Sequence, residues 1–347
     1  MILKLHAETP IVKGYLRSCI YDLSRKTHDF IPNEIGYKML AYENMPADVI
    51  AAEFDDDDKQ WLNYFLDKEY AFFIDEAFAE CFPKIDFTWL TPSLITNAII
   101  DISPSSPGFN YKYLEQLNCK HLLLRFFGLH NPDDIIKYLD NAVKDFTFKS
   151  IDVVIEKNPA ITKKEYSVFA KALLKQVRQI TSLNFAEEKK EEGFVPQLVL
   201  NIDTFSEGQS YNTYFNRKLY ISATGDIKNS IEDTVVHGNI KDIESYNSFR
   251  TITEKQQFQK NGDIKKDDIS VCKDCEFRYM CIDNRIPQPS ATGGWYFEKE
   301  CAYNPYIAKW KGEDNYHTLK EAGIVLEAGE IKLDMAIIDE LNQLIWV

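Results

Sequence analysis

Three patterns of hydrophobic and polar positions follow one another along the chain. In the first pattern, residues 12–23 alternate as a β-strand does, and residues 24–27 form a plausible turn into a second strand. Helical spacing follows after Asn33, a candidate helix N-cap. The expected elements are strands at 12–23, 28–31 and 70–74 and helices that begin near 33 and 46 and span 59–68. Residues 1–86 are therefore predicted to form one small unit that opens with strands and then becomes helical.

The second pattern alternates between strand and helix over residues 87–205. The expected strands lie at 97–102, 122–127, 151–155, 181–185 and 198–202. Between them, Ile135 and Leu139, and then Phe169 and Leu173, recur at helical spacing, which predicts helices with one apolar face. Such alternation is typical of βα units around a parallel sheet and places the chain in the α/β class. The block is shorter than a complete (β/α)8 barrel, which takes ~250 residues.

The third pattern covers residues 206–347 and has fewer long apolar runs. Residues 218–227, with Thr224, Gly225 and Asp226 at the bend, predict a β-hairpin. Near the end, apolar residues at helical spacing predict a helix that docks on the body of the protein: Met335, Ile338, Leu341 and Ile345. The three patterns predict three domains, at 1–86, 87–205 and 206–347, within the two or three that this length allows.

Four cysteines of the third pattern carry most of the chemistry in the chain. Cys272, Cys275, Cys281 and Cys301 have the spacing C-x2-C-x5-C-x19-C. Four thiolates at such spacing are the ligands of an iron–sulfur cluster or of a tetrahedral zinc ion, and the residues alone favour neither metal. A redox pair or a chance CxxC is disfavoured because two further cysteines follow at short range. The four cysteines are therefore predicted to form one metal site.

The segment CKDCEFRYMCIDNRIP, which holds three of these cysteines, resembles the SPASM domain of peptide-modifying radical S-adenosylmethionine enzymes. The resemblance implies that Cys272, Cys275, Cys281 and Cys301 hold one auxiliary [4Fe-4S] cluster. The cysteine pattern of a second, inner cluster is missing, because Arg285 and Ser230 stand where that pattern needs thiols. The resemblance therefore implies one cluster kept and one lost.

The same resemblance raises the question of radical chemistry, which needs a C-x3-C-x2-C loop. No segment matches that loop, and residues 103–109 after the first strand of the parallel sheet read SPSSPGF, without a thiol. We therefore expect no binding of S-adenosylmethionine. The histidines form no HExxH motif, and Arg125 is expected in a buried salt bridge, so we assign no catalytic residue. Whether the chain is an enzyme stays open at this point.

At a finer level, the chain is similar to the SPASM-domain peptide maturases of grasp-with-spasm (graspetide-type) gene sets. The similarity is carried by IVKGYLRSCIYDL, FIPNEI, ITNAIID, LLLRFF and the cysteine segment. It implies a winged-helix-like domain at 1–86 that recognises a leader peptide, a degenerate partial (β/α) barrel at 87–205 and a SPASM-like domain at 206–347. A purely structural cap is the alternative for residues 1–86. The similarity also implies two partners, a ribosomally made precursor peptide and an ATP-grasp ligase.

Charge and hydropathy limit the partners and the cellular compartment that we expect for the chain. With 40 basic and 54 acidic residues the formal net charge is −14, which disfavours nucleic acid and favours a basic peptide, a basic protein or simple solubility. The acidic run at 55–58 is expected to be a solvated approach to a helix. Lys273 and Arg278 lie within the cysteine run and offset thiolate charge unless they face water. No stretch reaches the ~18 apolar residues of a membrane span, so we expect a cytoplasmic protein without membrane contact.

Three functions remain as hypotheses after this reading. The first is a maturation factor that binds the precursor leader, carries one [4Fe-4S] cluster and works with the ligase. The second is a peptide-modifying redox enzyme with a reaction of its own. The third is an adaptor protein stapled by zinc.

Overall fold

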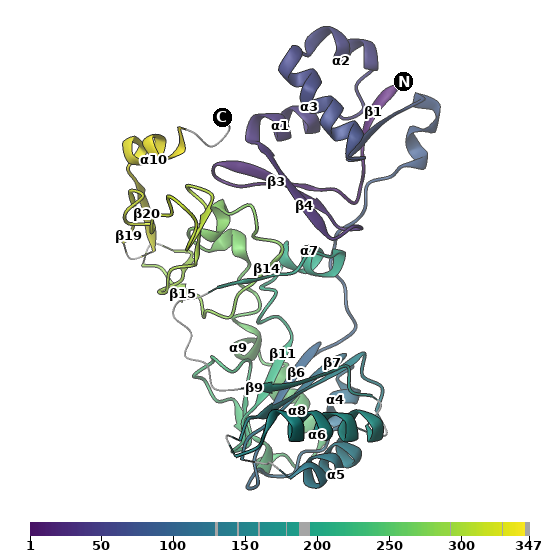
Figure 1. Cartoon of the computed structure of the whole chain (residues 1–347), viewed down its shortest axis with the longest axis vertical. Coiled ribbons are helices and arrows are strands. Elements are labelled where there is room, and N and C mark those ends of the chain that lie inside the picture. Colours follow the sequence, from purple (N-terminus) through teal and green to yellow (C-terminus); the bar gives the residue numbers. More distant parts are fainter. Residues whose placement is uncertain are drawn as a thin grey trace. The chain divides into compact units, whose positions relative to one another are not determined.

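The computed structural model describes residues 1–128, 131–143, 146–158, 160–177, 179–186, 195–291, 293–327 and 329–343 (Figure 1). Packing divides the chain into two compact units. Unit 1 comprises Met1–Trp89, Gly193–Thr213 and Ile264–Val347, and unit 2 comprises Leu90–Glu192 and Tyr214–Asp263. A compact unit is defined by packing rather than by independent folding, so the predicted domain boundaries stay predictions.

Unit 2 is built on a seven-stranded sheet in the order β13-β12-β11-β6-β7-β8-β9. The strands are β6 (Asn97–Ile102), β7 (His121–Phe126), β8 (Ser150–Glu156), β9 (Ser182–Ala186), β11 (Lys218–Ile221), β12 (Asp226–Lys228) and β13 (Gly238–Asn239). The helices are α4 (Lys112–Gln116), α5 (Pro132–Val143), α6 (Lys163–Gln176), α8 (Tyr246–Thr253), α9 (Gln256–Gln259) and the 3-10 helix η2 (Ile240–Asp242). Strands β11, β6, β7, β8 and β9 are parallel, which confirms the α/β class.

One face of this sheet forms the core of unit 2. Ala98, Leu124 and Val153 are buried on it together with Leu139 of α5 and Leu173 of α6. Because strands β6 to β9 pair in sequence order, right-handed crossovers place α4, α5 and α6 on the same face, as Figure 1 shows. The helical stripes predicted in α5 and α6 are therefore confirmed as core-facing.

One predicted strand of the parallel sheet is wrong. Within 198–202, only Leu198 belongs to a strand, β10 (Gln197–Leu198), and β10 pairs antiparallel with β14 (Cys281–Ile282) in unit 1. The chain then enters α7 (Ile202–Gly208), because the side chain of Asn201 accepts a hydrogen bond from the backbone N–H of Thr204 at 2.8 Å and caps the helix. The predicted hairpin is confirmed as β11 and β12, and β11 pairs with β6 in the central sheet.

Unit 1 opens with the predicted order of strands followed by helices. The elements are β1 (Ile2–Leu5), β2 (Ile11–Lys13), β3 (Arg17–Asp22), β4 (Thr27–Pro32), α1 (Asn33–Ala41), α2 (Ala47–Glu53), α3 (Asp56–Asp67), β5 (Ala71–Ile74) and the 3-10 helix η1 (Glu76–Cys81). The predicted strand 12–23 is interrupted, because the N–H of Gly14 donates to the carbonyl of Arg17 at 2.8 Å and closes a tight turn. Strands β2, β3 and β4 form an antiparallel sheet, and β5 pairs with β1.

The β2-β3-β4 sheet is a middle layer with buried side chains on both faces. Ile20 and Ile31 pack with the helices α1 to α3 in one core. Cys19 and Tyr21 point the other way, into a core that they share with Phe277 of the cysteine segment. The alternation read from the sequence thus separates two interiors, one on each face of the same strands.

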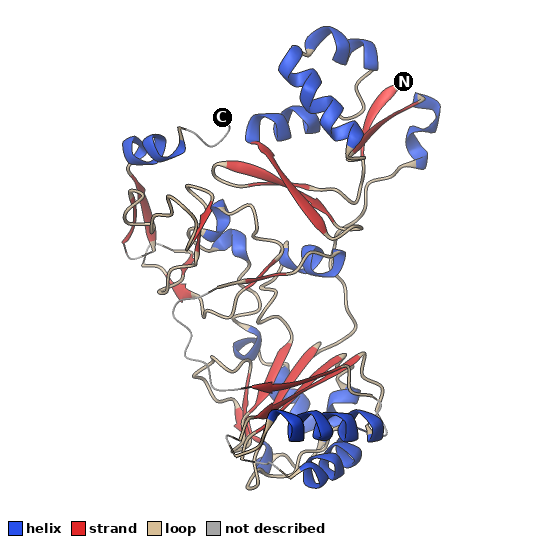
Figure 2. Ribbon diagram, in the orientation of Figure 1, coloured by secondary structure: helices blue, strands red, loops and turns tan. Residues whose placement is uncertain are grey.

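The remainder of unit 1 consists mainly of loops and very short strands (Figure 2). Its elements are the 3-10 helices η3 (Lys266–Asp268) and η4 (Cys272–Asp274), the strands β15 (Gln288–Pro289), β16 (Trp295–Tyr296), β17 (Tyr303–Asn304), β18 (Lys309–Trp310), β19 (Ile324–Glu327) and β20 (Glu330–Leu333), and α10 (Met335–Asn342). The predicted C-terminal helix is confirmed as α10, whose Ile338 packs with Tyr306, while Ile345 lies outside the described residues.

No helix among the described residues combines the length and the apolar character needed to cross a membrane.

Candidate metal centre

The four predicted cysteines line one cavity in unit 1. Cys272 begins η4, Cys275 follows that helix, Cys281 begins β14 and Cys301 lies just before β17. The tertiary fold therefore brings residues 29 positions apart in the sequence to a common space, and none of the four forms a disulfide. Across the described residues, no three His, Cys, Asp or Glu side chains form a group ready to hold a metal ion. Metal ligation by these cysteines stays a prediction.

Apolar side chains make up most of the remaining wall of the cavity. The residues that line it include Leu198, Phe277, Tyr303 and Trp310, and the volume of the cavity is about 30 Å³. Neighbouring rings pack at centroid distances of 4.9 Å between Phe277 and Tyr303 and 4.8 Å between Tyr303 and Trp310. Burial of this kind keeps water away from thiolate ligands and, in iron–sulfur proteins, helps to set the reduction potential.

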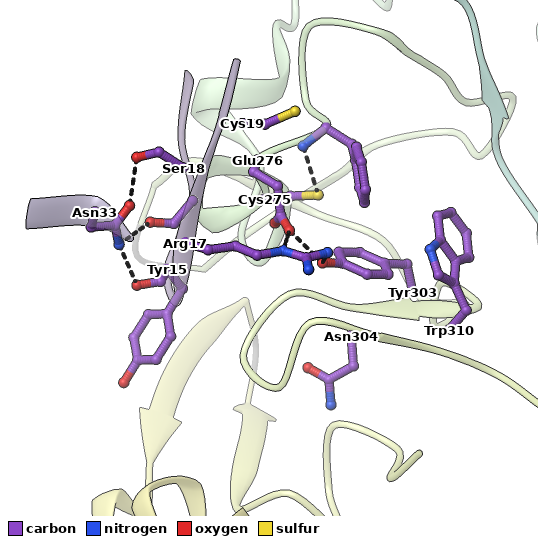
Figure 3. Close-up of polar contacts among 12 residues, drawn as sticks. Tyr15, Arg17, Ser18, Cys19, Asn33, Cys275, Glu276, Tyr303, Asn304 and Trp310 are labelled. Atoms are coloured by element: carbon purple, nitrogen blue, oxygen red, sulfur yellow. Dashed lines mark hydrogen bonds and ion pairs between the residues drawn. The ribbon is translucent and has the colours of Figure 1, made fainter. Parts of the chain in front are cut away.

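Two backbone amides point at cysteine sulfurs. The N–H of Phe277 donates to Sγ of Cys275 at 3.4 Å, and the N–H of Tyr303 donates to Sγ of Cys301 at 3.4 Å. Figure 3 shows the first of these bonds. In both cases the donor lies two residues after the cysteine, so a tight turn supplies it. Such bonds favour the thiolate over the thiol, which is the form that binds metal.

Burial raises the pKa of all four thiols. The pKa of Cys301 is raised to about 11, and those of Cys272, Cys275 and Cys281 are also raised, in each case first by burial. Charges of neighbouring thiolates and acids add to the effect, as the charge of Glu276 does at Cys275. Without a metal the four sulfurs are therefore expected to be protonated, and metal binding would release their protons.

A buried trio of charged residues borders the thiols. Lys266 is 1% exposed, and its Nζ lies 2.6 Å from Oδ2 of Asp283, which Arg285 also contacts through Nη2 at 2.7 Å. Burial alone would raise the pKa of Asp283, but Lys266 and Arg285 hold it at about 2. Both cations line the cavity, and the trio carries one net positive charge that opposes the charge of thiolates.

The sequence pattern missed this trio and gave an incomplete picture of the basic residues near the cysteines. Arg278 does line the cavity, but its guanidinium group contacts Asp267 at 3.1 Å and also donates to the carbonyl of Lys13. Lys273 does not line the described cavity. Nothing in the spacing of Lys266, Asp283 and Arg285 signals that they meet, since the pairing arises from the tertiary fold.

A second buried charge network joins the cysteine segment to β3 (Figure 3). Glu276 is fully buried, and its Oε1 lies 2.7 Å from Nε of Arg17 and accepts a hydrogen bond from the hydroxyl of Tyr303. Asn33, predicted as an N-cap, is instead the first residue of α1, and its amide donates to the carbonyls of Gly14 and Tyr15. It thereby fixes the turn that precedes Arg17.

Unit 2 contains one further charge cluster, at the carboxyl ends of β6 and β7. Arg125 makes a two-pronged ion pair with Asp101, at 2.6 Å and 2.7 Å, and the hydroxyl of Tyr220 donates to the same carboxylate at 2.8 Å. The predicted salt bridge of Arg125 is therefore confirmed. Ser230, which stands where a second cluster would need a cysteine, is buried in this unit.

Comparisons with known proteins give little beyond this geometry. No protein-family model matches the chain, and no curated protein matches it. Two crystal structures of Streptococcus suis SuiB are similar to it. The structure bound to S-adenosylmethionine has 8% sequence identity and a TM-score of 0.23, and the match covers 81% of this chain and 95% of that chain. The other has 9% identity and a TM-score of 0.23, covering 80% and 94%. Likeness at this level carries no argument about function.

Proposed function

We propose that this chain is a maturation factor for a ribosomally synthesised, post-translationally modified peptide. In this proposal it binds the leader of the precursor peptide, carries one [4Fe-4S] cluster and works with an ATP-grasp ligase in the cytoplasm. The observation that carries the proposal is the shared cavity of Cys272, Cys275, Cys281 and Cys301, because these are the cysteines on which the SPASM-like pattern depends.

The side chains of the cavity suit a cluster in which a cysteine ligates each of the four irons. Four thiols, two N–H donors to sulfur and a net positive trio of side chains are the features that stabilise a thiolate-bound cluster. A cluster with four cysteine ligands stabilises the fold or transfers electrons. A tetrahedral zinc ion uses the same four ligands, and we keep it as the alternative.

The β2-β3-β4 sheet offers the surface for a leader peptide. Strand β4 pairs with β3 alone among the described strands, so one of its edges is open to a further strand. The connection between α3 and β5 contacts this strand, because Asp29 accepts a hydrogen bond from Tyr70 at 2.7 Å and pairs with Lys68 at 3.1 Å. An extended peptide that adds to such an edge gains backbone hydrogen bonds and places alternate side chains near the helix.

The remaining parts of the proposal follow from the resemblance and the charge. Residues 1–86 are taken as the winged-helix-like leader domain, 87–205 as the core of a degenerate partial barrel and 206–347 as the SPASM-like domain. The net charge of −14 favours a basic leader over nucleic acid. We assign no catalytic residue and no binding of S-adenosylmethionine.

The first experiment measures the metal. The protein is purified without oxygen, iron and sulfide are quantified, and the reduced sample is examined by EPR. About four irons and four sulfides per chain are expected for a [4Fe-4S] cluster. The Cys275→Ala variant should lose them, whereas Cys81→Ala, at an exposed cysteine outside the cavity, should retain them. Colourless protein with one zinc ion would instead support the zinc-stapled adaptor.

The second experiment tests leader binding through the peptide backbone. A fluorescein-labelled leader of the precursor peptide that the resemblance implies is titrated by anisotropy, with single N-methyl groups placed along it. Addition to the edge of β4 predicts that N-methylation weakens binding at every second position, because alternate amides face the protein strand. A uniform response along the peptide would contradict docking by strand addition. A mass change in the precursor without the ligase would support the enzyme hypothesis.

A further inference from the structure

Strand β3, which pairs with the proposed docking strand β4, packs in one core with the segment that carries the cysteines, here called the cysteine loop. Cys19 and Tyr21 of β3 are fully buried and share this core with Phe277 and with the partly buried Cys275 and Cys301. The strand β3 and the segment that carries the cysteines therefore bury apolar side chains against each other.

Hydrogen bonds to backbone carbonyls of the cysteine segment join it to β3 and to the turn before β3. The N–H of Tyr15 donates to the carbonyl of Asp274 at 2.6 Å, and the hydroxyl of Tyr21 donates to the carbonyl of Glu276 at 2.6 Å. At Gly14, a Cβ atom would lie 2.9 Å from the backbone nitrogen of Glu276, a separation that a side chain does not tolerate. Loop residues on both sides of Cys275 thus touch the strands directly.

One aromatic side chain reaches from the cavity to the edge strand. Phe277 lines the cavity, and its ring lies 5.6 Å from that of Phe30 and 5.8 Å from that of His28, measured between centroids. Both partners belong to β4. Displacement of the Phe277 ring would therefore remove packing contacts from β4, the strand to which we propose that the leader adds.

The buried ion pair makes the contact costly to break. Arg17 of β3 pairs with Glu276 and also lies over the ring of Phe30, with 3.4 Å between the guanidinium carbon and the ring centroid. A loop that moved away would leave Glu276 or Arg17 without its partner in a buried setting, which is strongly unfavourable. The sheet and the loop are therefore expected to be ordered together or disordered together.

We propose that metal occupancy of the four-cysteine cavity controls the order of β3 and β4, and through them the affinity of the β4 edge for an extended peptide. The peptide part of this inference rests on the proposed function. Metal binding folds the loop around the thiols, and whatever packs on the loop is stabilised with it. Linkage is reciprocal, so the bound peptide increases the affinity for metal by the same factor by which metal increases the affinity for peptide. Between coupled sites this factor is typically about 5- to 150-fold.

Hydrogen exchange measured by mass spectrometry tests the structural half without any peptide. Metal-loaded protein is compared with protein from which the metal has been removed by anaerobic chelation, with the thiols kept reduced. Amides of β3 and β4 should exchange faster after removal, while α1 and α3, whose side chains share the core on the other face of the sheet, should stay protected. Unchanged exchange in β3 and β4 would overturn the inference, and so would equal loss of protection in the helices.

Anisotropy titration with the fluorescein-labelled leader tests the binding half. Metal-loaded protein should bind at least 5-fold more tightly than the metal-free form. The Phe30→Leu variant removes the ring contact with Phe277 outside the cavity, so it should keep its metal but show a smaller ratio between the two forms. Phe109→Leu, at a partly buried ring of unit 2, serves as the matched control and should keep the full ratio.

The outcomes separate the two proposals. Equal affinity of the loaded and metal-free forms would overturn the coupling and leave leader binding standing. Absence of binding by loaded protein would overturn the proposed function, while hydrogen exchange would still decide whether metal orders β3 and β4.

Discussion

At the scale of single residues, the Arg17 and Glu276 pair illustrates how much one buried contact contributes. We predict that Arg17→Met, which leaves Glu276 buried without its cation, lowers the free energy of unfolding of the metal-loaded protein by about 3 kcal/mol. This is the lower end of the usual range, because the Arg17 side chain is 18% exposed. Urea unfolding measures the change.

The double variant Arg17→Met with Glu276→Gln provides the control. It removes both charges, so it should lose less stability than the two single changes added together. Additive losses would show that the two side chains do not stabilise each other.

His237 gives a prediction for pH dependence in unit 2. Its side chain is 5% exposed, with Nε2 3.9 Å from Oδ2 of Asp233, and burial lowers its pKa from 6.5. The unfolded chain therefore binds a proton at a higher pH than the folded chain does. The contribution of the neutral His237 side chain to the free energy of unfolding is therefore fully present above pH 6.5. It is lost as the pH falls from 6.5 to the lower pKa of the folded state.

We predict that His237→Gln makes the stability of the protein fall less between pH 7.5 and 5.5. Urea unfolding at the two pH values measures the difference. The dependence should not vanish in the variant, because burial lowers the pKa of His28 as well. Equal losses in the wild type and the variant would contradict the role of His237.

Residue types and spacing predicted the cysteines but not their surroundings. That the four cysteines meet in one cavity could be expected, because their spacing in sequence is typical of metal ligands. The burial of Glu276, Lys266 and Asp283 could not be expected, because an isolated acid or base in a sequence is usually exposed and only the fold shows that these are buried in pairs.

At the scale of elements, α3 begins with a capping box that was not recognised in the acidic run of the sequence. The acidic run at 55–58 was expected to be solvated, but Asp58 is buried and forms a capping box with Asp55. The N–H of Asp58 donates to Asp55 at 2.9 Å, and the N–H of Asp55 donates to Asp58 at 3.1 Å. The expectation was therefore wrong for Asp58, which also pairs with Lys38.

We predict that Asp55→Ala lowers the free energy of unfolding by about 1 kcal/mol, the usual value for loss of an N-cap. Asp57→Ala, at an exposed position of the first turn, should change it much less. Thermal unfolding of the two variants measures the contrast. Similar small effects in both would indicate that the capping box contributes little.

Periodicity predicted those elements whose buried face repeats regularly. Strands β6 to β9 and helices α5 and α6 were predicted because one face of each packs in a single apolar core. The capped helix α7 was missed because its start is determined by a hydrogen bond that the backbone N–H of Thr204 donates to the side chain of Asn201. The two-residue strands between 281 and 310 have no detectable period.

At the scale of the whole molecule, the two units differ in what holds them together. Unit 2 has a large apolar core, whereas residues 264–310 of unit 1 pack in small clusters around the cysteine cavity. We predict that metal removal makes this segment sensitive to trypsin and leaves unit 2 resistant, because the free energy of metal binding is also free energy of folding. Mass spectrometry of the fragments identifies the cuts.

An unchanged fragment pattern after chelation would contradict a stabilising role of the metal. Cutting after Arg125 in β7 of unit 2 at the same rate as in the cysteine segment would show instead that the chain unfolds as a whole.

The middle-layer position of the β2-β3-β4 sheet has a practical consequence for protein engineering. A fragment that ends at Trp89 retains the helices on one face of the sheet but loses the loop that covers Cys19, Tyr21 and Phe30 on the other. Exposed apolar surface of this kind promotes aggregation. The proposed peptide-binding module is therefore not portable by simple excision, and its transplant into another scaffold requires a substitute lining or polar replacements on that face.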